Sequence, residues 1–507
     1  MGFLHSSIRA QVLSFLVVAN AASTWGASSL ISCLQSAGIN TVSPNTSGFT
    51  QDALAFNRRF EYTPAAIVFP QSAQDVAAAV KCAAASNGTV PVAARSGGHS
   101  YGAFGLGGQD GALVVDLSQM KNIVVNSDET ATFQTGNRLG DVALALFNNG
   151  GRALAHGTCP YVGSGGHAGC GGFGLASRMW GLVLDQVESA EVVLADGSIV
   201  QASASTNSDL FWAIRGASPS FGIVTEYKVK THAAPASNII FSYSYSVNPA
   251  TATKIFTAFQ TFSQSSAPPE LGLQASIGQS GQKNVISITL TGVYYGSTSA
   301  FNKVIAPLLS AVGVSPQSKS VKTYAWVPSL VELGGINTLN TSLSGDSHDT
   351  FFAKSLMVHE DALLTTTAIR GFFDYIGNQG ASTDTSWFVL ADLFGGKGSK
   401  VRAVSNDDTA YSQRKGLYNF QMYASSSNSQ PPFPADGLDF VNNMLTSITS
   451  KMPSNWSFGA YACYTDPTLT PAQWKSQYYG DNYSRLVSIH SKYNPSSLFR
   501  YPQSIGS

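Results

Sequence analysis

The sequence predicts an α+β protein of two domains, and three observations lead to this fold class. At 507 residues the chain exceeds the length that one hydrophobic core usually covers. A strand–helix–strand pattern near the N-terminus is typical of a parallel crossover unit. The second half instead alternates strands and helices, which predicts one broad antiparallel sheet covered by helices on a single face.

The first domain is expected to begin with the crossover unit. A short strand within residues 62–70 is bounded by prolines, an alanine-rich helix runs from about Ser72 to Ala85, and the strand from Val90 to Ala94 leads directly into Arg95. Further elements are expected as strands at 112–117 and 131–135, a helix at 139–149, a helix at 208–215 and a last strand at 221–231.

A dinucleotide-binding fold of the Rossmann type is not expected, although Gly169 to Gly174 matches its G-x-G-x-x-G fingerprint. That fingerprint requires a strand immediately before it, and here glycine, proline and histidine come first. Asp196-Gly197, which could supply the acidic ribose partner, instead lies between two apolar segments as the turn of an antiparallel hairpin.

The second domain begins near Pro235, where aromatic and hydroxyl side chains start to alternate. Phe241, Tyr243 and Tyr245 share one face of a strand, with serines on the other. The far face of the sheet needs a cover, which the first domain could supply. Helices are expected at 250–263, 298–311, 363–376, 436–452 and 478–493, and strands at 271–277, 285–294, 387–394, 417–423 and 457–464.

Composition and the N-terminus limit the partners and the location. Charged residues make up only 11% of the chain and the formal net charge is +0, so neither nucleic acid nor an acidic membrane surface is an expected partner. His5 and Arg9, the apolar run from Val12 to Ala19 and the small residues ending at Ala21 have the layout of a secretory signal peptide. Residues 1–21 are therefore expected to be removed from a secreted, extracellular protein, and no other stretch is long enough to span a membrane.

The cysteines and sequons fit a secreted chain. Five cysteines leave at least one outside any disulfide, and the sequence alone permits several pairings, including Cys159 with Cys170. No C-x-x-C or H-E-x-x-H spacing is present, so no metal site is expected. Glycosylation sequons occur at Asn45, Asn87, Asn340, Asn455 and Asn482.

Two glycine-rich segments are candidate ligand-binding loops. Residues 95–108 (the first segment) and residues 156–174 (the second segment) combine high glycine density with histidine, and the second also holds two cysteines. Glycine has no side chain to bury, so such segments are expected where backbone passes close to a ligand rather than in packed helices or strands. Together they predict one large, flat, polar ligand held from both sides.

Two motifs in these segments read RSGGHSY and HGTCPYVGSGGHAGCGGFG. Together with three later motifs they resemble the berberine-bridge-enzyme-like FAD-linked oxidases, above all the fungal oligosaccharide oxidases. The later motifs are residues 181–200, 209–227 and 478–499, in the same order as in the family. The resemblance covers almost the whole secreted chain. It implies a two-part FAD-binding domain of the PCMH type over residues 22–235, a substrate domain over 236–455 and a segment over 456–507 that returns to the FAD domain.

In that family FAD is attached twice, which implies bonds from His99 to the flavin 8-methyl group and from Cys159 to C6. His99 could otherwise be an ordinary loop histidine and Cys159 a buried thiol, but the set of motifs favours attachment. The other candidate cofactor-binding residues are Arg95, Ser96, Gly97, Gly98, Ser100, Gly157, Thr158, Gly163, Gly166, His167, Gly174 and Ile223. The resemblance also implies a disulfide between Cys33 and Cys82, which would leave Cys170 and Cys463 as buried thiols.

The resemblance places the catalytic pair at Tyr464 and Asp392. In the oligosaccharide oxidases the matching tyrosine removes the proton of the anomeric hydroxyl while a hydride leaves C1 for flavin N5, with help from the aspartate. A free tyrosine has a pKa of about 10, so Tyr464 would need a lowered pKa to act as a base near neutrality. A nearby carboxylate would raise that pKa, so Asp392 is expected to position the tyrosine or relay a proton.

Residues of the expected substrate site lie on two adjacent strands. Alternation puts Phe388, Leu390 and Asp392 on one face of a strand and Gln421 on one face of the next. Asp392 and Gln421 could simply hydrogen-bond to each other or to loops. The resemblance instead implies that Gln421 and Tyr101 line the sugar site.

The sequence departs from the family pattern at two places. Members that oxidise glucose oligomers have W-x-Q-x-D on the first of these strands, where this chain has Phe388 and Leu390 before Asp392. Without the indole and the amide, a less polar or smaller substrate becomes credible. Cys463 also occupies a position where the family pattern has asparagine.

The resemblance therefore implies a secreted FAD-dependent oxidase that takes a hydride from C1 of an oligosaccharide or related sugar, giving a lactone and hydrogen peroxide with molecular oxygen as acceptor. The alternative is a biosynthetic oxidase of a phenol, alkaloid or polyketide, which Phe388 and Leu390 favour. A secreted binding protein without catalysis is disfavoured because all four candidate attachment and catalytic residues are present. A monomer is expected.

Overall fold

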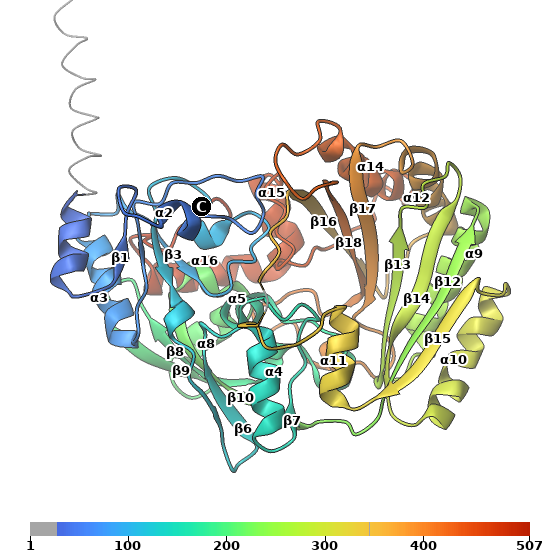
Figure 1. Ribbon diagram of the computed structural model, residues 1–507, viewed down its shortest axis with the longest axis horizontal. Helices are drawn as coiled ribbons and strands as arrows, with labels where there is room; N and C mark the ends of the chain where they lie inside the picture. The colour runs from blue at the N-terminus through green and yellow to red at the C-terminus, as the bar shows by residue number, and fades with distance from the viewer. Residues whose placement is uncertain (1–27, 344) are drawn as a thin grey trace, which may run out of the picture.

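The computed structural model describes residues 28–343 and 345–507, and the predicted signal peptide lies outside them (Figure 1). Within the described residues the strands form sheets of four, five, two and seven strands. The four- and five-stranded sheets lie in one half of the molecule, and the seven-stranded sheet with its helices forms the other (Figure 1). The predicted α+β class is confirmed. None of the described helices is long and apolar enough to cross a membrane.

The four-stranded sheet contains the predicted crossover. Strand β2 (Ala66–Val68), helix α3 (Ala73–Ala84) and strand β3 (Val92–Arg95) follow one another, and both strands run parallel to β4 (Leu113–Asp116), which lies between them. β1 (Thr41–Val42) pairs antiparallel with β2 at the edge. Because β3 ends at Arg95, the first glycine-rich segment begins at the carboxyl end of a parallel strand.

The five-stranded sheet is antiparallel and packs against helices, including the last helix of the chain. Its strands in spatial order are β5 (Ile123–Val125), β6 (Thr130–Gln134), β10 (Ile223–Lys230), β8 (Val187–Val193) and β9 (Ile199–Ser203). The helices are α4 (Leu139–Asn148), α8 (Ser208–Ala217) and α16 (Tyr483–Tyr493). The predicted hairpin is confirmed, because β8 and β9 pair across Asp196, whose carboxylate accepts a 2.8 Å hydrogen bond from the Ser198 N–H. Leu486 and Ile489 of α16 belong to the same apolar core.

The seven-stranded sheet is antiparallel throughout, with helices on one face (Figure 1). Its strands in spatial order are β15 (Ser318–Tyr324), β12 (Asn238–Val247), β14 (Ile286–Tyr295), β13 (Leu271–Gly278), β17 (Thr385–Leu393), β18 (Gly416–Ser426) and β16 (Phe351–His359). The covering helices are α9 (Pro249–Ser265), α10 (Thr298–Val312), α12 (Thr366–Gln379) and α14 (Gly437–Thr449). Phe241, Tyr243 and Tyr245 share the helix-covered face, as the alternation predicts.

Two strands and two helices of this half were not predicted, one of the helices being the four-residue α13 (Lys400–Ala403). β16 is buried at all but its last residue, so its sequence lacks the alternation that marks a half-buried strand. β15 is mostly exposed and polar at the opposite edge of the sheet. Helix α11 (Trp326–Gly334) buries Trp326 and Leu330 in a cluster with Ala143 of α4.

The predicted strand at 457–464 is wrong, and the predicted helix at 478–493 is confirmed only from Tyr483 onward, as α16. In this segment only Gly459 forms a β-bridge, to Met357 of β16. Tyr464 lies in a turn, where its N–H donates a 2.9 Å hydrogen bond to the Tyr461 carbonyl oxygen. Before α16 the chain makes a π-helical turn (Lys475–Tyr479) and a 3₁₀ turn beginning at Gly480. Gly480 has φ +49°, which interrupts the α-helical path.

One of the five sequons is not available for glycosylation in the folded protein. Asn482 is 6% exposed, and its side-chain amide donates hydrogen bonds to three backbone carbonyl oxygens, the shortest at 3.1 Å to Asn406. The sequon asparagines Asn45, Asn87 and Asn455 are exposed, and Asn340 is partly buried.

Candidate active site

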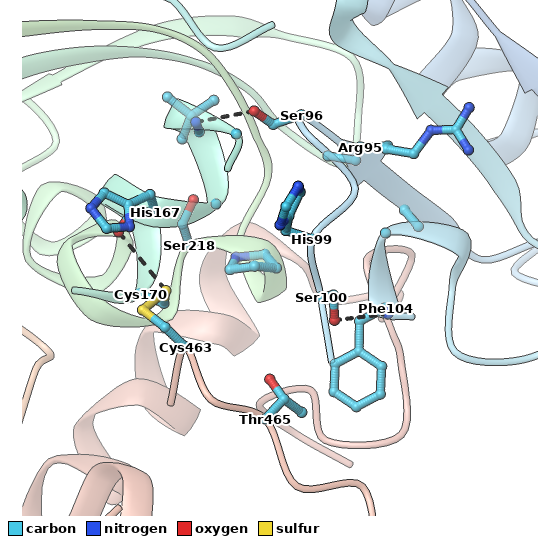
Figure 2. A pocket seen from close by; sticks show the side chains of 18 of the residues that line it. Arg95, Ser96, His99, Ser100, Phe104, His167, Cys170, Ser218, Cys463 and Thr465 are labelled. Atoms are coloured by element: carbon cyan, nitrogen blue, oxygen red, sulfur yellow. Dashed lines mark hydrogen bonds between the residues drawn. A yellow bond between two sulfur atoms is a disulfide. The ribbon is translucent and has the colours of Figure 1, made fainter. Parts of the chain in front are cut away.

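Two adjoining cavities are candidate sites, and the second lies where segments of both halves meet. The first is lined by residues 92–100, by glycines of the second glycine-rich segment and by C-terminal residues including Gln503 (Figure 2). The second has a volume of about 790 Å³ and is lined by the helix-free face of the seven-stranded sheet together with residues 157–159. His99, Val162, His167 and Cys463 line both cavities, so the two spaces meet at these residues.

The second glycine-rich segment contains a packed helix, contrary to the prediction. α5 (Ser164–Cys170) buries Ser164, Ala168 and Gly169. A Cβ on Gly165 would lie 2.9 Å from the Thr135 Cβ, and one on Gly169 would lie 2.7 Å from the Ser218 Cβ. Two of these glycines therefore serve close packing of a helix, in addition to the passage of a loop.

The two glycine-rich segments cross backbone against backbone at Gly97 and Gly163. A Cβ on Gly97 would lie 2.3 Å from the Gly163 nitrogen, so no side chain fits there. Beside the crossing, Ser96 donates a hydrogen bond to the Thr135 carbonyl oxygen and accepts one from the Gly165 N–H at 3.2 Å (Figure 2). A Cβ on Gly166, in contrast, would project into open space at the first cavity.

His99 lies where the cavities meet and is held from two sides. Its ring stacks on Phe56 with centroids 4.1 Å apart and an interplanar angle of 24°. His99 Nε2 lies 2.9 Å from Asp346 Oδ2, and the same oxygen lies 3.0 Å from Arg138 Nη1. Burial by itself would raise the pKa of the Asp346 carboxyl, but the hydrogen bonds and charges of His99 and Arg138 together lower it.

Cys159 carries a free thiol that is exposed at the second cavity. The Cys33–Cys82 disulfide is present, as the resemblance implies. The expectation of two buried thiols is wrong, because Cys170 and Cys463 form a second disulfide (Figure 2). It joins the end of α5 to the residue before Tyr464, across 293 positions of sequence, and such a pairing cannot be deduced from cysteine spacing.

His167 is a neutral hydrogen-bonding residue that fixes the neighbouring loop. Burial, and then the nearby His156, lowers the pKa of His167 to about 3. Its Nε2 accepts a 3.2 Å hydrogen bond from the Gly157 N–H, which assigns the ring proton to Nδ1. His156 Nδ1 lies 2.8 Å from the Gly157 carbonyl oxygen, so both rings hold the loop that carries Thr158 and Cys159.

Asp392 on β17 and Tyr464 in the C-terminal turn both line the second cavity. Burial raises the pKa of Asp392 to about 6, although Gln274 of the adjacent strand donates a 2.6 Å hydrogen bond to its Oδ1. Burial, followed by nearby ionisable groups led by Asp392, raises the pKa of Tyr464 well above its ordinary value. The protein alone therefore does not lower the Tyr464 pKa, and the hydroxyl is protonated at neutral pH.

Tyr464 is packed between two other tyrosines. The Tyr101 ring is parallel to it at 5.6 Å, and the Tyr461 ring meets it edge-on at 5.1 Å. Gln421 donates a hydrogen bond to the Tyr101 hydroxyl. Asp392 and Gln421 thus bond to different partners rather than to each other, in contrast to the simpler alternative raised by the sequence.

The predicted face of β17 and β18 is confirmed. Phe388 pairs with Tyr423 and Leu390 with Gln421 across the two strands, and all four side chains line the second cavity. The Phe388 and Tyr423 rings stack with centroids 4.7 Å apart. The same alternation could have identified Gln274, a lone amide in the strand sequence LGLQASIG, which the sequence analysis missed.

The remaining candidate cofactor residues differ in their placement. Arg95 points away from His99 in Figure 2 and pairs with Asp116. Ser100 accepts a 3.0 Å hydrogen bond from the Phe104 N–H beside the first cavity. Gly98, with φ +77°, also lines that cavity.

Two further candidates are placed by packing. Ile223 is buried in an apolar cluster and lines neither cavity, whereas its neighbours Gly222 and Val224 line the first. Gly174 lines the second cavity, but a Cβ there would lie only 1.8 Å from the His156 carbonyl oxygen, so close backbone packing explains this glycine. In the described part of the chain, no group of three or more His, Cys, Asp or Glu side chains could hold a metal ion.

Comparison with known proteins agrees with this arrangement. A family model described as an FAD binding domain matches residues 64–203, and one described as berberine and berberine like matches residues 460–506. The chain is 36% identical to a chitooligosaccharide oxidase of Gibberella zeae over 99% of both chains. It is 38% identical to an FAD-linked oxidoreductase of Metarhizium anisopliae over 94% of this chain and 90% of that one.

A solved structure of glucooligosaccharide oxidase from Acremonium strictum, which carries a 6-S-cysteinyl, 8α-N1-histidyl FAD, matches with a TM-score of 0.87. The two are 35% identical, and the match covers 94% of this chain and 99% of that one.

Proposed function

The chain belongs to the berberine-bridge-enzyme-like family of FAD-linked oxidoreductases, and on this premise we propose that it is a secreted oxidase acting at C1 of an oligosaccharide or related sugar. The observation that carries this proposal is a single cavity lined by His99 and Cys159, the candidate attachment residues, and by Asp392 and Tyr464, the candidate catalytic pair. The products would be a lactone and hydrogen peroxide, with molecular oxygen as acceptor.

The residues around the first cavity fit FAD. Backbone of both glycine-rich segments lines it, and Gly166 leaves open the space that a side chain would fill. Gln503 also lines it, with a buried Oε1 that has no hydrogen-bond partner among the described residues. Buried polar atoms are almost always paired in proteins, so this acceptor suits a donor group of a ligand.

We assign the two attachments to His99 and Cys159, in line with the cysteinyl and histidyl links of the Acremonium strictum enzyme. The N1 position of that histidyl link corresponds to Nδ1 of His99. When bound, FAD would supply the hydride acceptor and would pass the electrons on to oxygen. Two attachments would retain the cofactor beside a cavity wide enough for an oligomer.

The proton chemistry falls to Tyr464 and Asp392. The raised pKa of Tyr464 means that the residue is not a standing tyrosinate, so its Oη would accept the substrate hydroxyl proton only while releasing its own. Asp392, with a pKa of about 6, is ionised above that pH and acts strongly enough on Tyr464 to raise its pKa. We therefore assign Asp392 the role of receiving the tyrosine proton.

Tyr101 and Gln421 are the candidate substrate-positioning residues. Their mutual hydrogen bond joins the loop after His99 to β18, so both sides of the cavity contribute to the same contact. Phe388 and Leu390 provide an apolar wall on β17. This wall favours a second candidate function, oxidation of a phenolic, alkaloid or polyketide metabolite by the same flavin chemistry.

The chain organisation is part of the proposal. We assign a signal peptide to residues 1–21, an FAD-binding domain to 22–235, a substrate domain to 236–455 and a returning segment to 456–507. The apolar contacts of α16 with the five-stranded sheet support the last assignment. We propose a monomer that needs no macromolecular partner.

A substrate screen tests the proposal. Purified protein would be assayed for peroxide with cello-, xylo-, chito- and malto-oligomers and with a panel of aromatic alcohols. Turnover of a sugar series supports the first function and turnover of the aromatic series the second. A protein whose yellow colour does not bleach with any of them in the absence of air contradicts both.

A further inference from the structure

Asp346 contacts His99 from a loop 247 positions away in the sequence. The Asp346 Oδ2 to His99 Nε2 distance is 2.9 Å, and Arg138 holds the same oxygen at 3.0 Å. The side chains of His99, Asp346 and Arg138 are each at most 27% exposed, so water screens the interactions between them only partly.

This contact sets the tautomer of the ring. An ionised carboxylate only accepts hydrogen bonds, so Nε2 carries a proton, and in the neutral ring the lone pair is therefore on Nδ1. Among the described residues, no hydrogen bond to Nδ1 of His99 competes for that lone pair. His99 is therefore oriented as a nucleophile at Nδ1.

We propose that Asp346, held by Arg138, is the positioning residue that directs attachment of flavin to Nδ1 of His99. The inference rests on the proposed function, because it presumes attachment at His99. Asp346 would act through the histidine and would not touch the flavin.

The attachment step exchanges a C–H bond of the flavin 8α carbon for a bond to His99 Nδ1. The Nδ1 lone pair forms a bond to the 8α carbon, and that carbon loses one proton to solvent. The electron pair of the broken C–H bond stays on the flavin, and molecular oxygen takes two electrons from it to give peroxide. Bond formation puts positive charge on the imidazole, whose Nε2 proton points at the Asp346 carboxylate and then leaves through it to solvent.

The loop around Asp346 has anchors of its own, so substitution of this residue tests the contact rather than the loop. Thr341 donates a 2.6 Å hydrogen bond to the Asp141 carboxylate of α4. On the other side, the Arg58 N–H donates to the Asp349 carbonyl oxygen at 2.7 Å, and His348 Nδ1 lies 2.8 Å from the Ala55 carbonyl oxygen.

The test compares the full-length mature chain with Asp346→Ala and Asp346→Asn, using Asp141→Asn as a control that loosens the same loop without touching His99. Each protein is collected at intervals after induction of expression in air, and mass spectrometry follows the fraction of flavin attached at His99 and at Cys159 separately. We expect linkage at His99 to slow by roughly tenfold or more in both Asp346 variants, the effect of losing a charge-assisted hydrogen bond. Linkage at Cys159 and the control should keep the wild-type rate.

Three results would overturn the inference. They are an unchanged rate at His99 in Asp346→Ala, equal slowing at both attachment sites, and equal slowing in the Asp141→Asn control. If the wild-type protein itself carries no flavin at His99, the proposed function fails instead, so the two failures can be told apart.

Discussion

Cys170 and Cys463 form a disulfide that fixes the turn carrying Tyr464 to the end of helix α5. Cys463 lines both cavities, so this bond lies between the candidate cofactor site and the candidate substrate site. The position of the candidate catalytic tyrosine therefore depends on a covalent link to the end of helix α5.

Replacing both cysteines of this disulfide should lower activity as well as stability. We expect Cys170→Ser/Cys463→Ser to lose about 2–4 kcal/mol of unfolding free energy, the usual contribution of a disulfide. The kcat for the best substrate should also fall, because Tyr464 loses its anchor. Urea unfolding and steady-state kinetics provide the measurements.

The other disulfide is the matched control. Cys33→Ser/Cys82→Ser removes a bond at the N-terminal edge of the molecule, far in sequence from either catalytic candidate. It should lower the free energy of unfolding and leave kcat unchanged. Equal effects of the two double variants on kcat would contradict a positioning role for Cys170–Cys463.

Removing the Tyr464 hydroxyl should abolish most of the turnover without loss of flavin. We expect Tyr464→Phe to reduce kcat by roughly 10²–10⁴-fold, the usual contribution of a positioned acid or base. Its absorbance near 450 nm should match that of wild type. Tyr375→Phe, in the helix layer, serves as the control, and a kcat for Tyr464→Phe within threefold of wild type would rule out the assigned role.

Substituting Asp392 by asparagine should raise the free energy of unfolding and lower activity. Its folded-state pKa of about 6 lies above the unfolded value of 3.8. The free energy of unfolding therefore falls as pH rises from about 4 to about 6, and the loss stays constant at higher pH. Asp392→Asn should therefore gain about 3 kcal/mol at pH 8 and little at pH 3.5. Chemical denaturation at both pH values checks this; a loss of stability at pH 8 would be inconsistent with the raised pKa.

The same pKa predicts the pH dependence of turnover. If Asp392 must be ionised to receive the Tyr464 proton, kcat should rise through a pKa of about 6 and level off above it. Asp392→Asn should lose both the rise and most of the rate. A flat wild-type profile between pH 5 and pH 8 would speak against proton relay.

The apolar wall on β17 should control the choice of substrate. Phe388→Trp/Leu390→Gln restores the pattern of relatives that oxidise glucose oligomers and adds a hydrogen-bonding amide to the cavity. We expect kcat/KM for malto- and cello-oligomers to rise relative to that for aromatic alcohols. Phe388→Leu, which keeps the wall apolar, should leave the ratio unchanged, and a falling ratio in the double variant would refute the assignment.

The sequence predicted those parts of the fold that local patterns determine. The crossover around α3, the Asp196 hairpin and the paired faces of β17 and β18 all follow from turn residues or from alternation. β16 was missed because burial on both faces removes alternation, and α5 was missed because its glycines are selected by tight packing with Thr135 and Ser218.

Residues of the candidate site were predictable only where they belong to a recognisable sequence motif. His99, Cys159, Asp392 and Tyr464 were found through motifs, and the structure places all four around one cavity. Asp346 had no local signal, because its contact with His99 exists only after distant segments fold together. The same holds for the Cys170–Cys463 pairing.

The central claim is that one flavin is bound through both His99 and Cys159. Mass spectrometry of a proteolytic digest of the purified, yellow protein tests it most directly. The account predicts one species in which the His99 peptide and the Cys159 peptide are joined through a single FAD. Two unmodified peptides, with the yellow chromophore released by acid, would contradict it.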